Sequence, residues 1–160
     1  MELSLADEAA TAAAGAALAH GLPDIRDHSL LLGLSGELGS GKTTLARALL
    51  RALGVGGTIR SPTFTLVEPY DTRAGVVHHL DLYRLEPGGS DLQALGYRDL
   101  RGQPGLVIVE WPERGGDALG RPDLELTLEH RPSGRCLKGH AATEAGRRWL
   151  SALSRFAVSS

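Results

Sequence analysis

A glycine-rich segment at residues 36–44, with the sequence GELGSGKTT, carries the residue types and spacing best suited to chemistry. The spacing G-x-x-x-x-G-K-[ST] of a phosphate-binding P-loop is satisfied by Gly36, Gly41, Lys42 and Thr43. Glycines let backbone N–H groups approach phosphate oxygens, and the N-terminus of a following helix adds partial positive charge. Lys42 would reach the β- and γ-phosphates, and Thr43 would offer its hydroxyl to Mg²⁺. The segment therefore predicts a nucleotide-binding loop.

The lysine content of the chain supports this interpretation and favours ATP. Among the 17 lysine and arginine residues, only Lys42 and Lys138 are lysines, so a lysine inside the loop is not a product of a lysine-rich composition. A guanine-specific N-K-x-D motif also needs a lysine, and Lys138 stands in Leu-Lys-Gly, which does not match. We therefore expect ATP as the nucleotide, bound together with Mg²⁺.

A P-loop also needs a carboxylate at the end of a neighbouring strand to hold Mg²⁺, directly or through water. Two residues meet this requirement: Asp81 in HHLDLYR and Glu110 at the end of LVIVE. Either one taken alone could be a solvated carboxylate at a strand end, and the P-loop is what favours a role in metal binding or catalysis. A metal site made by His78 and His79 is disfavoured, because adjacent residues of a strand point to opposite faces.

Composition describes an ordinary globular chain of 160 residues, with 42% hydrophobic and 22% charged residues, and we expect one domain over residues 1–160. The net charge of −2 gives no general attraction to nucleic acid or to an anionic membrane. Cys136 is the only cysteine, which excludes a disulfide framework. Acidic residues replace the basic start of a signal peptide, and no apolar run is long enough to span a bilayer. A cytoplasmic location without membrane contact is expected.

Hydrophobic periodicity predicts alternating helices and strands. Helices are expected at residues 5–20 (with Ser4 and Asp7 as a capping box), 43–53, 90–95 and 143–156. Strands are expected at residues 30–34, 64–67, 76–83, 106–109, 123–129 and near 136–137. The clean alternation of 123–129 indicates a half-exposed antiparallel strand near a sheet edge. The fold class is therefore α/β, a P-loop NTPase-like three-layer α/β/α sandwich whose mixed sheet has a parallel centre and antiparallel C-terminal strands.

Three further motifs follow the P-loop in order: SPTF at 61–64, HLDLYR at 79–84 and EWPE at 110–113. With them the sequence resembles the TsaE (YjeE-type) family, small bacterial P-loop ATPases. The family supports synthesis of N6-threonylcarbamoyladenosine at position 37 (t6A37) of tRNAs that read ANN codons. The resemblance extends from Asp7 to Arg135.

The resemblance implies a set of site residues. Lys42, Asp81 and Glu110 would be catalytic, and Thr43, Glu110 and Asp81 would bind the metal. The nucleotide-binding set would comprise Thr11, Gly36, Glu37, Leu38, Gly39, Ser40, Gly41, Lys42, Thr43, Thr44, Thr63 and Arg135. Within it, Thr63 would sense the γ-phosphate, and Thr11 and Arg135 would lie on the adenine side. In the family, Trp111 matches a position tied to activity more than to binding.

The resemblance also implies a Mg²⁺-dependent ATP hydrolase that works with a threonylcarbamoyl transferase heterodimer of TsaB and TsaD types. Hydrolysis would reset that complex between rounds, and tRNA would be met only indirectly. No arginine finger is obvious in the sequence, so turnover of the isolated chain is expected to be slow. The alternatives are a small-molecule kinase of the shikimate or nucleoside type, for which an arginine-bearing lid is not evident, and a non-hydrolytic adaptor, which Asp81 and Glu110 disfavour.

Overall fold

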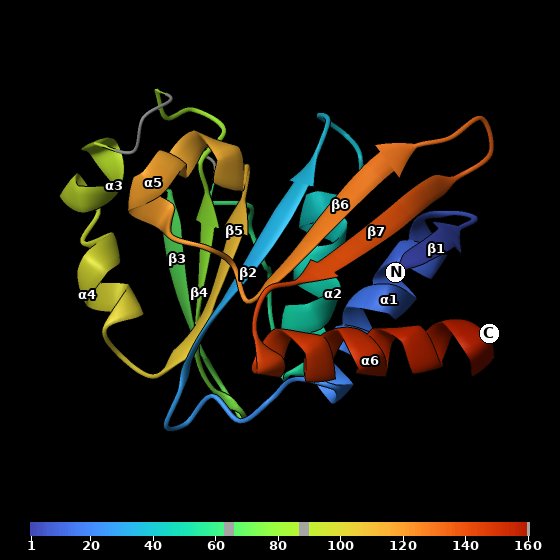
Figure 1. The fold of residues 1–160 in the computed structure, drawn as a ribbon, viewed down its shortest axis with the longest axis horizontal. Coiled ribbons are helices and arrows are strands. Elements are labelled where there is room, and N and C mark those ends of the chain that lie inside the picture. Colours follow the sequence, from blue (N-terminus) through green and yellow to red (C-terminus); the bar gives the residue numbers. More distant parts are fainter. Residues whose placement is uncertain (63–65, 87–89, 160) are drawn as a thin grey trace.

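The computed structural model describes residues 1–62, 66–86 and 90–159. The strands of this part of the chain form one sheet in the order β1-β7-β6-β2-β5-β4-β3 (Figure 1). Their bounds are β1 (Glu2–Leu5), β2 (Ser29–Gly36), β3 (Val67–Thr72), β4 (Gly75–Asp81), β5 (Gly105–Glu110), β6 (Leu124–His130) and β7 (Arg135–Ala141). The helices are α1 (Glu8–His20), α2 (Lys42–Ala52), α3 (Ser90–Ala94), α4 (Tyr97–Arg101), the 3-10 helix η1 (Pro112–Gly115), α5 (Gly116–Leu119) and α6 (Glu144–Ser159).

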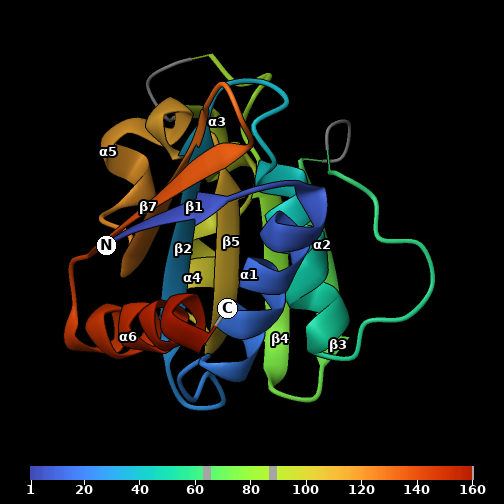
Figure 2. The same cartoon turned by 90° about the vertical axis from the view of Figure 1, so that its right-hand side faces the viewer.

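Helices cover both faces of the sheet. One buried apolar cluster joins α1, α2 and α6 to one face, and a second joins α3, α4 and α5 to the other. Figure 2 shows α1 and α2 on one side of the strands and α5 on the other. The α/β class and the three-layer arrangement expected from the sequence are thereby confirmed. Within the described ranges, every helix is too short or too polar to cross a lipid bilayer.

Strand β2 lies at the centre of the sheet and leads into the P-loop. It pairs in parallel with β5 on one side and with β6 on the other. Leu30, Leu32 and Leu34 pack in the cluster with α1 and α2, whereas Leu31 packs in the opposite cluster. A strand buried on both faces needs a continuous apolar run, which explains the sequence LLLGL. The parallel centre and the strand at 30–34 are confirmed.

The prediction that residues 123–129 form an antiparallel strand near a sheet edge is correct for the pairing with β7 and wrong for the position, because β6 lies inside the sheet. Strand β6 pairs in parallel with β2, from Leu32 opposite Leu124 to Gly36 opposite Leu128, and it is antiparallel only to β7. Its alternation arises because one face is packed against helices while the other face stays partly exposed. Alternation reports the cover on the two faces of a strand, and it carries no information about the strand's neighbours.

The predicted start of the first helix is also wrong. Residues 2–5 form β1, which pairs antiparallel with β7, and Ser4 lies opposite Cys136 in that ladder. The helix starts at Glu8, where the side chain of Asp7 accepts a hydrogen bond of 2.8 Å from the N–H of Ala10. A four-residue strand is too short to show a period, and Asp7 is as good a cap as Ser4.

The expected strand at 64–67 is described only from residue 66 onward, because residues 63–65 lie outside the described part. The strand seen there, β3, runs from Val67 to Thr72 and contains Pro69. It is an edge strand, where a residue without an N–H is tolerated. The remaining predicted elements are confirmed, with ends shifted by up to four residues.

Candidate functional site

The turn between β2 and α2 has the backbone conformation that its glycines allow. Gly36, Gly39 and Gly41 have φ angles of 138°, 76° and 109°. A Cβ atom on Gly36 would lie 2.3 Å from the carbonyl oxygen of Leu128, so a side chain is excluded there by backbone contact as well as by dihedral strain. Gly41 is the N-cap of α2, and no side chain of the described residues caps that helix. The N-terminus of α2 therefore has the free N–H groups of an anion-binding site.

Lys42 is buried beneath this turn. Its Nζ donates hydrogen bonds to the carbonyl oxygens of Gly36 (2.6 Å) and Glu37 (2.9 Å), and it lies 4.2 Å from the ring centroid of Trp111. Burial lowers the pKa of Lys42, while the negative charges of Glu110 and its neighbours act in the opposite direction. The ammonium is thus held inside the loop by carbonyl oxygens and an aromatic face.

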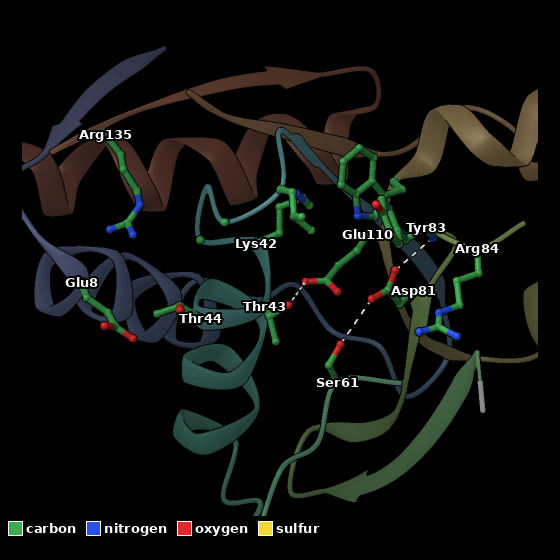
Figure 3. Close-up of a pocket in the computed structure, with 14 residues that line it drawn as sticks. Glu8, Lys42, Thr43, Thr44, Ser61, Asp81, Tyr83, Arg84, Glu110 and Arg135 are labelled. Atoms are coloured by element: carbon green, nitrogen blue, oxygen red, sulfur yellow. Dashed lines mark hydrogen bonds between the residues drawn. The ribbon is translucent and has the colours of Figure 1, made fainter. Parts of the chain in front are cut away.

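Asp81 and Glu110 are direct neighbours, because they pair across the parallel strands β4 and β5. Thr43 donates a hydrogen bond of 2.7 Å from Oγ1 to Oε1 of Glu110. Asp81 accepts from Oγ of Ser61 at 3.2 Å and from the N–H of Tyr83 at 3.0 Å (Figure 3). The structure therefore joins the P-loop, the strand-end carboxylates and the segment at Ser61 into one site.

The two carboxylates differ in how readily they take a proton. Burial raises the pKa of Asp81, and the adjacent charge of Glu110 adds to this effect. Burial alone would also raise the pKa of Glu110, but His79 and Thr43 outweigh it, so this pKa is lowered. Of the two carboxylates, Asp81 is therefore the one that takes up a proton more readily.

His79 is a residue to which sequence reasoning assigned no role. Its side chain is fully buried, and its Nε2 lies 3.6 Å from Oε2 of Glu110. Residues two apart on a strand share a face, so the spacing of His79 and Asp81 already places both on the side of the sheet that carries Glu110. The spacing of His79 and Asp81 was therefore the sequence signal that could have placed His79 next to the carboxylates.

The P-loop, Asp81, Glu110 and Ser61 line a cavity of about 360 Å³. Figure 3 shows Asp81, Glu110 and Arg84 at one end, and Glu8, Thr44 and Arg135 at the other. Its lining residues are Glu8, Leu38, Gly39, Gly41, Lys42, Thr43, Thr44, Ser61, Asp81, Tyr83, Arg84, Glu110, Trp111 and Arg135. Sequence reasoning placed Ser61 in the segment of Thr63 but gave no role of their own to Glu8, Tyr83 or Arg84, which only the fold brings to the cavity.

Trp111 has an unusual backbone conformation next to the carboxylates. Its φ of 59° and ψ of 52° are in the left-handed region, which is rare for a bulky residue and costs of order 1–3 kcal/mol. Its N–H donates to the carbonyl oxygen of Leu34 at 3.1 Å. The ring centroid lies 5.0 Å from that of Tyr83, with the two rings tilted by 48°, and the guanidinium of Arg114 lies over the Tyr83 ring. This conformation places the indole against Lys42.

Three of the residues expected to bind the nucleotide, Thr11, Thr63 and Arg135, lie outside the P-loop in the sequence. Thr11 is buried and does not line the cavity; its hydroxyl donates to the carbonyl oxygen of Asp7, and its methyl group lies next to Gly41. Arg135 lines the cavity, and its Nε is buried with no hydrogen-bond partner among the described residues. Thr63 lies outside the described residues. The nucleotide-binding roles of these three residues, like those of the P-loop residues, remain predictions.

The chain matches, over residues 5–137, the model of the family described as threonylcarbamoyl adenosine biosynthesis protein TsaE. The tRNA threonylcarbamoyladenosine biosynthesis protein TsaE of Haemophilus influenzae is 34% identical over 128 residues, covering 80% of each chain. The protein of the same name from Streptomyces coelicolor is 35% identical over 126 residues, covering 76% of this chain and 84% of the relative.

A solved structure has the same fold. The crystal structure of Bacillus subtilis YdiB superposes with a TM-score of 0.77 and covers 97% of this chain and 94% of the other. The two sequences are 22% identical, so this likeness concerns the fold alone.

Proposed function

The chain belongs to the TsaE family, and on that premise we propose that its P-loop cavity binds and hydrolyses ATP in the biosynthesis of tRNA threonylcarbamoyladenosine. The observation that carries this proposal is the contact of Thr43 with Glu110, with Asp81 beside them. A P-loop that only bound phosphate would not require two adjacent buried carboxylates next to its metal-binding hydroxyl.

The donor atoms at this position suit Mg²⁺. Thr43, Glu110 and Asp81 offer oxygen, which Mg²⁺ prefers, and they lie at the end of the cavity away from Glu8. The described residues contain no cluster of three or more His, Cys, Asp or Glu side chains able to hold a metal alone. That pattern agrees with Mg²⁺ in P-loop sites, which takes the remainder of its ligands from phosphate and water. Bound Mg²⁺ would neutralise charge on the transferring phosphoryl group.

The residues of the chain divide the remaining work. The α2 N-terminus and Lys42 bind phosphate oxygens and stabilise their negative charge. Asp81, whose pKa burial raises, would orient the attacking water and take up its proton. Glu110 stays ionised and holds the hydroxyl of Thr43. Arg84 lines the same end of the cavity and would meet charge that develops on the γ-phosphate.

We further propose that hydrolysis serves a protein partner, a threonylcarbamoyl transferase heterodimer of TsaB and TsaD types, which it resets between rounds. The test is a reconstituted modification assay with this chain, the two transferase subunits and tRNA. Lys42→Ala should leave at most one round of modification, whereas the wild-type chain should support many rounds. Repeated turnover with Lys42→Ala at the wild-type rate would refute the proposed role of hydrolysis.

A further inference from the structure

His79 is a fully buried imidazole beside the proposed metal-binding carboxylate, and the reaction as described above does not use it. We propose that His79 is the positioning residue of Glu110: it supports the carboxylate oxygen that Thr43 does not reach, and so orients Glu110 for Mg²⁺. The inference rests on the proposed function, because it assumes that Mg²⁺ binds with the nucleotide at this site.

The sheet geometry brings the two side chains together. Along β4, His79 and Asp81 lie on one face, and both strands of the pair end at the same edge, where Asp81 is opposite Glu110. On Glu110, Oε1 accepts the hydrogen bond from Thr43 and Oε2 is 3.6 Å from Nε2 of His79. The two oxygens of this carboxylate thus face different partners.

The imidazole has no competing partner among the described residues. Neither Nδ1 nor Nε2 forms a hydrogen bond there, and Oε2 of Glu110, at 3.6 Å from Nε2, is the carboxylate oxygen that the imidazole meets. A buried imidazole without a partner is unfavourable unless it faces a group that its N–H attracts. Glu110 is that group, and it is itself only 1% exposed.

Asp81 explains why Glu110 needs support on this side. The two carboxylates are nearest neighbours across β4 and β5, and like charges so close repel each other. Repulsion from Asp81 favours rotation of the Glu110 carboxylate away from Asp81. An N–H of His79 directed at Oε2 opposes that rotation and so keeps Oε1 facing Thr43. Partners of this kind behind metal ligands commonly contribute about 10- to 100-fold to metal affinity.

The experiment measures ATP binding to the full chain by calorimetry, first in EDTA and then across a Mg²⁺ titration. In EDTA, His79→Leu should bind ATP within about twofold of wild type, but it should need at least about tenfold more Mg²⁺ to gain affinity. His79→Gln should recover part of this loss, because its amide N–H can donate where Nε2 does. The matched control is His78→Gln, the neighbouring histidine on the opposite face of β4.

A double-mutant cycle tests whether His79 acts through Glu110. In a Glu110→Gln background, His79→Leu should not raise the Mg²⁺ requirement any further. The Glu110→Gln substitution also removes the buried negative charge that His79→Leu alone would leave without a neighbouring donor. An unchanged Mg²⁺ requirement in His79→Leu, or equal losses in the Leu and Gln variants at wild-type melting temperature, would overturn the inference. If the ATP affinity of the wild-type chain does not depend on the Mg²⁺ concentration, the proposed function itself is refuted, and the inference with it.

Discussion

The ammonium of Lys42 lies 4.2 Å from the ring centroid of Trp111. Trp111 itself has a left-handed backbone, with a φ of 59°. The same ammonium donates to the carbonyl oxygens of Gly36 and Glu37. Its charge is therefore fixed in the loop by neutral groups, with no carboxylate bound to it by a hydrogen bond among the described residues. A cation held in this way keeps its charge available to a phosphate group.

Removal of this cation should weaken nucleotide binding. We expect Lys42→Ala to lower ATP affinity by at least about tenfold, because a charge-assisted hydrogen bond contributes roughly 1.5–3 kcal/mol. Calorimetry measures the effect. Lys138→Ala is the matched control, since the other lysine pairs with Glu129 on the protein surface and should bind ATP as wild type does. Equal affinities for Lys42→Ala and Lys138→Ala would contradict the assignment.

Asp81 should matter for hydrolysis more than for binding. Asp81→Asn keeps the size of the side chain but removes the proton acceptor, so we expect ATP hydrolysis with partners present to fall by about 100-fold or more. Affinity for ATP measured in EDTA should change little, since Asp81 is proposed to meet Mg²⁺ and water and not the nucleotide. Phosphate release and calorimetry give the two values, and Asp71→Asn, on the exposed side of edge strand β3, is the control. A parallel loss of affinity and rate would show that Asp81 acts in binding.

Arg84 is the arginine that the sequence analysis did not recognise as a candidate for charge stabilisation. It lines the cavity next to Asp81 (Figure 3). We expect Arg84→Ala to lower the hydrolysis rate by at least about tenfold while ATP affinity stays within about threefold, because arginine contacts of this type act on the transition state. Arg98→Ala, at an exposed position of α4, should match wild type. Undiminished hydrolysis in Arg84→Ala would leave that role to a residue of a partner.

Tyr97 should give the fold a specific pH dependence. Burial raises its pKa to about 12, and its hydroxyl donates to the carbonyl oxygen of Leu119 at 2.6 Å. The unfolded chain loses this proton near pH 10 and the folded chain only near 12, so the contribution to stability falls as pH rises between these values.

The measurement is urea denaturation of wild type and Tyr97→Phe at pH 8 and pH 11. Tyr97→Phe should cost about 1 kcal/mol at pH 8, for the lost hydrogen bond. The difference between the two proteins should shrink at pH 11, because only wild type carries the titrating hydroxyl. A constant difference across this range would refute the assigned pKa shift.

Local patterns predicted the parts of the site that local geometry determines. The P-loop follows from the spacing of Gly36, Gly41 and Lys42, since these residues need no distant contact to adopt their conformation. Asp81 and Glu110 were recognisable as strand ends. Their direct pairing was not, because it depends on β4 and β5 being neighbours in the sheet.

Other features depend on long-range packing or on an unfavourable conformation. The left-handed backbone of Trp111 runs against the intrinsic preference of a bulky residue, so no propensity indicates it. The position of β6 in the sheet was misjudged for a related reason: a half-exposed face is compatible with an edge strand and with an interior one. Functional sites are where such departures from local preference are expected.

The position of β2 in the sheet has a consequence for how the protein matures on the ribosome. The P-loop strand is made early in synthesis, yet both strands that flank it, β5 and β6, begin only at Gly105 and Leu124. Pairings between such distant segments form late and slowly. The nascent chain therefore carries a complete P-loop motif long before the strands that flank β2 exist. If the chain binds ATP as proposed, ATP would stabilise only a chain whose synthesis has passed β6.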